Sequence, residues 1–277
     1  MRALLQVNRN SRLGTALGDQ VRAELEACGI QLVDADSPQA ASERPDCIVA
    51  VGGDGTIARM IPRAIELGVP LGVVPIGTFN ELARTLGIPF DVSAACATIG
   101  AGHTRTIDVA RVNGAYYTSE ASLGVSSRIA RLQKPQDKQR FGFLAIVASV
   151  FQAIRHIRPM RAEVEFDGRV ERFKTVQLTI ANSDRFGGIL SVSDASIDNG
   201  WLDLYSVDIH NVYEAFSVAR AMIQGKREPA PGLRTYRSTR FSVRTRHRHR
   251  ISADGESAGR TPAVFEVLPK ALDVIVP

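Results

Sequence analysis

The most informative stretch of the chain is residues 47–56, Cys-Ile-Val-Ala-Val-Gly-Gly-Asp-Gly-Thr. The five apolar residues predict a buried strand, and the glycines after them predict a tight turn into a helix. Glycine lets backbone N–H groups approach an anion, and the positive end of a helix attracts the same anion. We therefore interpret the segment as a phosphate-binding turn, in which Thr56 caps the helix and Asp54 holds Mg²⁺. The alternative is a glycine-rich connection in which Asp54 is simply a helix cap.

The first hundred residues alternate between strand and helix patterns. Strands are expected at residues 3–7, 30–33, 47–51 and 71–75, and helices at 15–28, 57–67 and 81–86. This alternation is typical of a parallel sheet covered by helices, which binds ligands at the carboxyl ends of its strands. A second turn, Ile76-Gly-Thr-Phe-Asn80, follows the fourth strand. Two phosphate-compatible turns are thus expected on one edge of the sheet.

The pattern changes after Asp108 to strands that are rich in β-branched residues. These strands are expected at residues 109–112, 160–166, 170–180, 202–207, 236–243, 250–253 and 264–268, with helices at 141–157 and 211–224. The sequence therefore predicts an α/β protein with two domains packed around a cleft. Residues 1–112 form a Rossmann-like nucleotide-binding domain, and residues 113–277 form a mainly antiparallel β domain. The final strand either belongs to the β domain or returns to the nucleotide-binding domain.

The composition indicates an intracellular protein. The 277 residues are 44% hydrophobic, which is enough for sizeable cores, and the formal net charge is +5. The three cysteines are widely spaced without a metal-ligand pattern, which favours a reducing compartment. The N-terminus turns polar too early for a signal peptide, and no apolar stretch reaches the ~20 residues of a spanning helix. We expect a cytoplasmic location, with peripheral attachment to the inner membrane face as an option.

A late segment, Ser252-Ala-Asp-Gly-Glu256, carries two carboxylates at a hairpin signal. By itself the Asp-Gly pair favours an ordinary turn between strands. A kinase, however, needs a group that orients the acceptor hydroxyl and takes its proton. Glu256 is the better candidate for that role, because Asp254 is expected to serve the turn.

Four segments in this order resemble the diacylglycerol kinase catalytic-domain family, which includes bacterial lipid kinases and the sphingosine and ceramide kinases. They are Gly52-Gly-Asp-Gly-Thr56, Pro75-Ile-Gly-Thr-Phe-Asn-Glu-Leu-Ala-Arg84, Ile107-Asp-Val-Ala110 and Asp254-Gly-Glu256. The resemblance extends from Ala3 to the final strand. Gly-Gly-Asp-Gly alone is shared with NAD kinases and phosphofructokinases, whereas the second and fourth segments are more specific. The resemblance implies a phosphofructokinase- and NAD-kinase-like first domain.

The resemblance also implies a reaction and its site. ATP would bind in the interdomain cleft, and a lipid hydroxyl would accept the γ-phosphate, with Glu256 and Asp54 as catalytic residues. The implied nucleotide contacts are Gly52, Gly53, Asp54, Gly55, Thr56, Ile57, Ala58 and Thr78. A structural Mg²⁺ site in the β domain is implied at Ser196, Asp198, Asn199 and Trp201.

Three positions depart from the family's pattern. Asn199 stands where the family usually has an Asp metal ligand, and Asn brings no charge to Mg²⁺. Asp34 stands at the place of a Thr that contacts nucleotide, and Ser119 at the place of an Asn. These differences leave open an unusual substrate, reduced activity or an empty metal site.

Basic residues cluster in two stretches that suit an anionic membrane surface. One is the loop with Arg128, Arg131, Lys134, Lys138 and Arg140, and the other is the alternating series Arg234, Arg237, Arg240, Arg244, Arg246, Arg248 and Arg250. Alternation along strands predicts that many of the second series share a face. The alternative is a solvated strand face that discourages edge pairing. Nucleic acid is not an expected partner, because no aromatic platform accompanies the charge.

Three functions remain open from the sequence. The favoured one is an ATP-dependent kinase for a lipid alcohol, such as diacylglycerol or phosphatidylglycerol, at the membrane surface. The second is a kinase for a soluble acceptor such as NAD or a sugar alcohol, and the third is a non-catalytic nucleotide- or lipid-binding protein. An exposed β edge would also permit a homodimer. The identity of the lipid is not predicted.

Overall fold

The computed structural model describes residues 1–8, 12–37, 44–124, 159–182, 185–186, 190–191, 196–210, 213–214, 217, 220 and 231–277. The chain divides into two compact units, one of Met1–Val109 with Leu268–Pro277 and the other of Ala110–Val267. The division falls three residues before the expected one, and the last ten residues belong to the first unit. The helix expected at 141–157, and most of that at 211–224, lie outside the described residues.

A parallel sheet forms the centre of the first unit. In this sheet β1 (Arg2–Val7) lies between β2 (Gln31–Asp34) and β3 (Cys47–Gly52), and β4 (Leu71–Pro75) pairs with β3. β4 is also joined in parallel by the end of β18 (Ala263–Ile275), where Val274 lies opposite Leu71. Every residue of β3 and β4 is buried, as expected for apolar strands that are covered on both faces.

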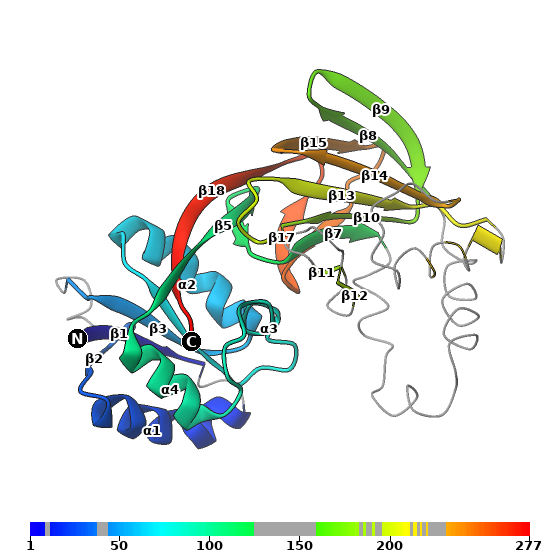
Figure 1. The fold of residues 1–277 in the computed structure, drawn as a ribbon. Coiled ribbons are helices and arrows are strands. Elements are labelled where there is room, and N and C mark those ends of the chain that lie inside the picture. The colour runs from blue at the N-terminus through cyan, green and yellow to red at the C-terminus, as the bar shows by residue number, and fades with distance from the viewer. Residues whose placement is uncertain are drawn as a thin grey trace. The chain divides into compact units, whose positions relative to one another are not determined.

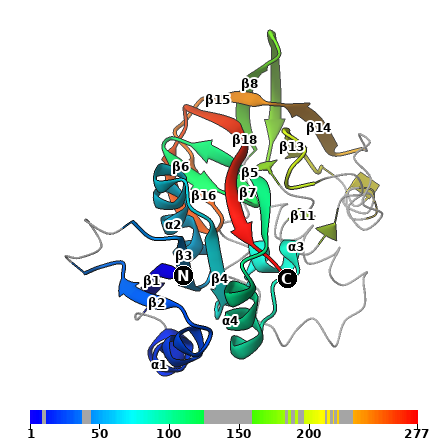
Figure 2. The same cartoon turned by 60° about the vertical axis from the view of Figure 1, so that its left-hand side comes forward.

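Helices cover this sheet on both faces (Figures 1 and 2). The helices α1 (Arg12–Ala27) and α4 (Val92–Ala101) lie together on one face, and α2 (Asp54–Leu67) lies on the other. Leu25 of α1 and Ile99 of α4 pack with Val49 in one buried cluster. A short helix, α3 (Glu81–Leu86), follows β4. No helix in the described ranges is long and apolar enough to cross a membrane.

The second unit is built from antiparallel strands. Six of them form one sheet, in the order β14 (Leu233–Ser238), β13 (Leu202–Val207), β10 (Gln177–Ala181), β7 (Glu120–Gly124), β16 (Arg250–Ala253) and β17 (Glu256–Arg260). A second layer contains the first part of β18 followed by β15 (Arg240–Thr245), β8 (Met160–Phe166) and β9 (Arg169–Thr175). The remaining strands are β5 (Thr104–Val112), which pairs with β18 and β6 (Ala115–Tyr117), and the pair β11 (Arg185–Phe186) and β12 (Leu190–Ser191).

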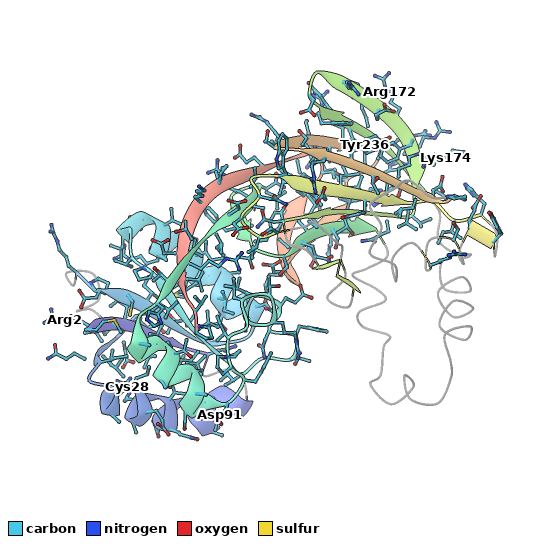
Figure 3. The ribbon with its side chains drawn as sticks, viewed as in Figure 1. Arg2, Cys28, Asp91, Arg172, Lys174 and Tyr236 are labelled. Atoms are coloured by element: carbon cyan, nitrogen blue, oxygen red, sulfur yellow. The ribbon has the colours of Figure 1, made fainter. Side chains whose placement is uncertain are left out.

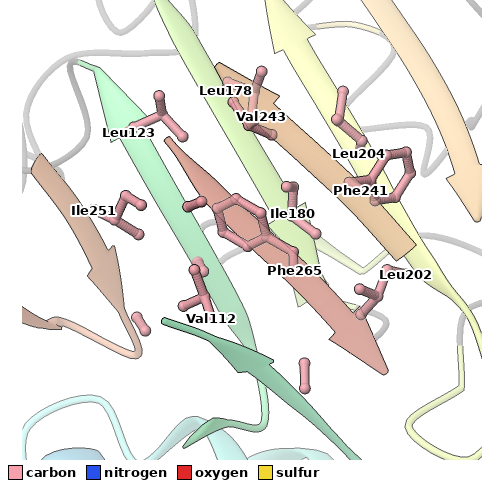
Figure 4. Close-up of a cluster of buried hydrophobic side chains, with 14 of the residues drawn as sticks. Val112, Leu123, Leu178, Ile180, Leu202, Leu204, Phe241, Val243, Ile251 and Phe265 are labelled. Atoms are coloured by element: carbon pink, nitrogen blue, oxygen red, sulfur yellow. The ribbon is translucent and has the colours of Figure 1, made fainter. Parts of the chain in front are cut away.

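The core of the second unit lies between these two layers (Figure 4). Leu123, Ile180 and Leu204 of the six-stranded sheet belong to one buried cluster with Phe241 and Phe265 of the other layer. Apolar residues that alternate along antiparallel strands bury one face of each sheet, and the two faces pack together. A mainly antiparallel β unit was expected here, and it is confirmed.

Two expected strands are each divided between the layers. Residues 170–180 form β9 and β10, and residues 236–243 form β14 and β15, which belong to different sheets. Short polar side chains satisfy backbone groups at both crossings: Thr175 Oγ1 donates to the carbonyl of Val207 (2.8 Å), and Ser238 Oγ accepts from the N–H of Arg240 (3.2 Å). An uninterrupted β pattern therefore does not show where a chain changes sheets.

Candidate active site

Two glycine-rich turns of the first unit pack against each other. The first joins β3 to α2 and the second joins β4 to α3. A Cβ atom on Gly77 would lie 2.3 Å from the Cα of Gly53, and one on Gly52 would lie 2.4 Å from Thr56 Oγ1. The absence of a side chain at Gly77 lets the second turn approach the first, and its absence at Gly52 leaves room for Thr56 within the first turn. Glycine was expected here for access to an anion, but at Gly52 and Gly77 it is required first for packing.

Asn80 holds the second turn in shape. Its backbone has a φ of 48°, in the left-handed region that Asn tolerates better than most residues. Its side chain is buried, and Oδ1 accepts a hydrogen bond from the N–H of Gly77 (2.9 Å) while Nδ2 donates to the carbonyl of Gly77 (2.9 Å). The turn that carries Thr78 is therefore fixed before any ligand binds.

Asp54 joins the two turns. Its Oδ1 accepts a hydrogen bond of 2.7 Å from the N–H of Glu81, the first residue of α3. Asp54 thus caps α3, although it lies in the first turn of α2. Burial raises the pKa of the Asp54 carboxyl, while hydrogen bonds from backbone N–H groups, Glu81 first, act in the opposite direction. A partly desolvated carboxylate of this kind is suited to a cation such as Mg²⁺.

Thr56 is not the cap that the sequence predicts. The helix α2 begins at Asp54 with Gly53 as its N-cap, so Thr56 lies inside the first turn. Its side chain is buried, and Oγ1 has no hydrogen-bond partner among the described residues. A buried hydroxyl without a partner is unfavourable. A phosphate oxygen at the helix N-terminus could satisfy it, so the turn fits the phosphate group of a nucleotide.

The remaining expected nucleotide contacts lie around the same turns. Gly55, Ile57 and Ala58 are in the first turns of α2, and the side chain of Ile57 is part of the core. Thr78 is exposed between β4 and α3. The fold therefore brings together the whole set expected from residues 52–58 and Thr78. Their role in nucleotide binding stays a prediction.

Asp34 is paired with a cation. The carboxylate of Asp34, at the end of β2, lies 2.5 Å from the guanidinium of Arg22 on α1. An acidic side chain near nucleotide phosphates would repel them if its charge were uncompensated. The ion pair with Arg22 reduces that repulsion, although the Asp34 side chain is 46% exposed and water weakens the pairing.

In the second unit, Asp254 anchors a loop rather than its own turn. Asp254 and Gly255 have φ values of 45° and 85° and connect β16 to β17. One carboxylate oxygen of Asp254 accepts from the N–H of Thr118 (2.7 Å). The other accepts from the N–H groups of Ser119 (3.1 Å) and Glu120 (3.0 Å). Three backbone donors therefore fix the hairpin to residues 118–120, where β7 begins.

Glu256 is the exposed carboxylate of this anchored hairpin. It begins β17, directly after the Asp254–Gly255 turn. Within the described residues its side chain makes no hydrogen bond or ion pair. A carboxylate that is held by a rigid turn and has no such partner can accept a proton from a bound hydroxyl. Asp54 belongs to the first unit and Glu256 to the second.

The expected structural metal segment is a turn before β13. Asn199 Oδ1 accepts from the N–H of Trp201 (2.9 Å), and Ser196 Oγ hydrogen-bonds Asp198 Oδ1. The Asn199 oxygen is therefore engaged within the turn. No cluster of three or more His, Cys, Asp or Glu side chains suited to a metal occurs in the part of the chain that the structure describes. Mg²⁺ binding at residues 196–201 stays a prediction.

Comparison with protein families identifies both halves of the chain. Residues 4–112 match the diacylglycerol kinase catalytic domain, and residues 119–276 match the YegS C-terminal NAD kinase beta sandwich-like domain. The chain belongs to the diacylglycerol kinase catalytic-domain family. Membership of this kinase family supports a phosphotransferase activity that uses ATP as its phosphate donor. The resemblance stated from the motifs is confirmed.

Individual relatives agree with this assignment. A diacylglycerol kinase of Bacillus subtilis is 29% identical over 243 residues, which cover 86% of this chain and 80% of that protein. A diacylglycerol kinase of Staphylococcus aureus is 25% identical over a matched region that covers 87% of this chain and 78% of that protein.

Solved structures show the shared fold. A crystal structure described as a diacylglycerol kinase from Bacillus anthracis has a TM-score of 0.73 at 23% identity. The superposed region covers 100% of this chain and 96% of that chain. An NAD kinase from Archaeoglobus fulgidus in complex with ATP has a TM-score of 0.56 at 13% identity, with 99% and 93% covered. The expected NAD-kinase-like fold is confirmed.

Proposed function

We propose that this protein is an ATP-dependent lipid kinase that transfers the γ-phosphate to the hydroxyl of a lipid alcohol such as diacylglycerol or phosphatidylglycerol. The observation that carries the proposal is the hairpin at Asp254, which binds three backbone N–H groups and leaves Glu256 exposed beside them. The relatives named diacylglycerol kinase support a lipid as the acceptor.

Each part of the site has a role in the proposed reaction. The N-terminal turn of α2 and the hydroxyls of Thr56 and Thr78 bind the ATP phosphates. Asp54 holds Mg²⁺, which supplies positive charge to the phosphate oxygens when it is bound. Glu256 takes the proton of the acceptor hydroxyl as that oxygen bonds to the γ-phosphorus. The bond from the γ-phosphorus to the bridging oxygen breaks, and ADP leaves with the electron pair.

Two alternatives have specific support. The likeness to an NAD kinase fold keeps a soluble acceptor open. The departures at Asp34, Ser119 and Asn199 motivate a non-catalytic protein. The first two are accommodated, because Arg22 pairs with Asp34 and Ser119 contacts Asp254 through its backbone N–H. That second contact is independent of the side chain, so Ser119 in place of Asn preserves it.

A transfer assay separates the three functions. The purified protein is incubated with γ-labelled ATP, Mg²⁺ and one acceptor at a time. Diacylglycerol, phosphatidylglycerol and sphingosine are offered in uncharged detergent micelles, and NAD and glycerol in solution. We expect label in one of the lipids. Label in NAD or glycerol alone would establish a soluble acceptor, and ATP binding without transfer to any acceptor would contradict a kinase.

A further inference from the structure

The outer face of three neighbouring strands in the second unit carries a basic trough. The trough has a volume of about 700 Å³ and lies over β8, β9 and β15. Five cationic side chains and one carboxylate line it: Arg161, Arg172, Lys174, Arg244, Arg246 and Glu163. Figure 3 shows Arg172 and Lys174 on β9. This concentration of charge is separate from the hairpin and its anchored loop, and the proposed kinase reaction does not use it.

Strand register explains why these residues gather on one face. Arg161 lies opposite Lys174 and Glu163 lies opposite Arg172 in the β8–β9 pair. In the β15–β8 pair, Arg244 lies opposite Glu163. Directly opposite residues of an antiparallel pair point to the same face, and so do alternate residues along each strand. The register therefore places four cations around Glu163, and Glu165 lies on the same face opposite Val170.

The trough retains a positive charge. Glu163 is bonded to Arg172 at 2.7 Å, but Arg161, Lys174 and Arg244 form no ion pair within the described ranges. Like charges directly opposite each other destabilise a sheet, so the placing of Arg161 opposite Lys174 does not stabilise the β8–β9 pair. A cluster that lowers stability and leaves its charge uncompensated suits an anionic partner.

The C-terminal arginines do not form the single strip that the sequence predicts. Arg237 is bonded to Asp203 at 2.8 Å, and Arg234 lies over the ring of Phe173, 4.0 Å from Asp208. These two arginines are on β14, whereas Arg244 is on β15, and the two strands belong to different sheets. The expected strip is therefore divided, and Arg244 joins cations of β8 and β9 instead.

We propose that this trough is the surface with which the protein binds the anionic phospholipid headgroups of a membrane. The cations stand on extended strands, of which β8 and β15 are paired on both sides and β9 on one. Successive N–H groups of an extended strand point in opposite directions, so these strands do not form the N–H nest that encloses a single phosphate. The Arg172 side chain is 75% exposed, and Val170, an exposed apolar residue, shares its face of β9. Exposed basic and apolar side chains together are typical of contact with a lipid surface.

Vesicle binding without ATP tests this surface. The probe is a set of vesicles of phosphatidylglycerol mixed with phosphatidylcholine, compared with vesicles of phosphatidylcholine alone. The trough variant carries Arg161→Gln, Lys174→Gln and Arg244→Gln. The control variant loses the same charge from the first unit through Arg59→Gln, Arg63→Gln and Arg105→Gln. Each basic residue near an anionic membrane contributes about fivefold to binding, so the trough variant should bind roughly 100-fold more weakly.

The result expected is weakened binding of the trough variant, near-wild-type binding of the control, and loss of binding at high salt. Equal weakening of both variants would overturn the proposal, because binding would then follow net charge. So would absence of wild-type binding, or displacement from the vesicles by millimolar inorganic phosphate, which would indicate a site for a soluble anion. The proposal extends the lipid-kinase function. Because the test contains no ATP and the kinase assay uses uncharged micelles, the two can fail separately.

Discussion

Asp54 illustrates how one side chain serves both the fold and the proposed chemistry. It accepts the N–H of Glu81 and is buried enough for its pKa to rise. Asp54→Asn retains an oxygen acceptor and removes the buried charge, so its unfolding free energy should equal or exceed that of the wild type. Asp54→Ala loses the cap of α3 and should be less stable by about 1 kcal/mol. Urea unfolding measures both.

Activity separates the two roles of Asp54. If the carboxylate holds Mg²⁺, both variants lose phosphate transfer, although the Asn variant is stably folded. An Asn variant that unfolds as readily as the Ala variant would show that the acceptor oxygen is not what stabilises the turn. Full activity of the Asn variant would remove Asp54 from the reaction.

Tyr117 gives a prediction about pH. Its ring is fully buried, its hydroxyl has no hydrogen-bond partner in the described part of the chain, and burial raises its pKa well above the usual value. Because a buried unpartnered hydroxyl is unfavourable, Tyr117→Phe should be more stable than the wild type by about 1 kcal/mol at neutral pH.

The difference between Tyr117→Phe and the wild type should widen at alkaline pH. In the unfolded chain a Tyr releases its proton near pH 10, whereas folded Tyr117 keeps it. The wild type therefore loses stability as the pH rises above about 10, and the Phe variant lacks this contribution. Urea unfolding at neutral pH and above pH 10 measures the change. A constant difference would contradict the raised pKa.

At the residue scale, the sequence identifies the local turn better than the tertiary contacts. The motif of residues 52–56 correctly indicates a strand-to-helix turn. The partner of Asp54 is 27 residues away along the chain, and no local spacing identifies it. Thr56 was wrongly assigned as a cap because the helix begins two residues earlier, at Asp54. Helix ends depend on tertiary hydrogen bonds as well as on local capping residues.

At the scale of elements, the β16–β17 hairpin owes its position to Asp254. Asp254→Ala leaves the N–H groups of Thr118, Ser119 and Glu120 without their carboxylate. At about 1 kcal/mol for each hydrogen bond, the variant should lose roughly 2–3 kcal/mol of unfolding free energy. It should also lose phosphate transfer, because Glu256 follows this turn.

Asp167 provides a matched control for Asp254. It occupies an Asp-Gly turn with a similar φ of 47°, but its Oδ1 accepts from the hydroxyl of Ser238 rather than from backbone groups. Asp167→Ala should therefore cost about 1 kcal/mol. Chemical denaturation of both variants measures the two losses of unfolding free energy. Equal losses would mean that the anchoring of residues 118–120 contributes little beyond the turn itself.

Two different physical causes explain the elements that the sequence did not predict. The helix α4 is rich in Ala and largely apolar, so it lacks the alternation of polar and apolar faces that marks a surface helix. Its ends nevertheless carry signals, because Asp91 accepts from the N–H of Ala94 and Gly102 is left-handed. At Thr175 and Ser238 the chain changes from one sheet to the other. Where it does so depends on which distant strand is available for pairing, and the periodicity of the sequence carries no information about that partner.

At the scale of the whole molecule, the return of the C-terminus makes the first unit depend on the last residues. Ile275 is buried in the cluster of β3, α1 and α4 side chains. Ile275→Ala should lower the unfolding free energy by about 2–5 kcal/mol. Hydrogen exchange should then accelerate in β3 and β4 more than in β10 and β13.

The half-buried Val276 is the control for this strand. Val276→Ala removes less buried surface and should leave the exchange of β3 and β4 near that of the wild type. Equal acceleration in both units of the Ile275 variant would show that they unfold as one. Unchanged exchange in the first unit would contradict the packing of the returning strand.

The rate of lipid phosphorylation by Glu256→Gln tests most directly whether Glu256 takes the proton of a lipid hydroxyl. Glu171→Gln is the matched control, since Glu171 is an exposed glutamate on β9 of the same unit. Loss of a general base should lower kcat/KM by roughly 10²–10⁴, while thermal stability, ATP binding and the activity of the control stay near wild type. A Glu256→Gln enzyme that phosphorylates lipid at the wild-type rate would exclude Glu256 as the proton acceptor.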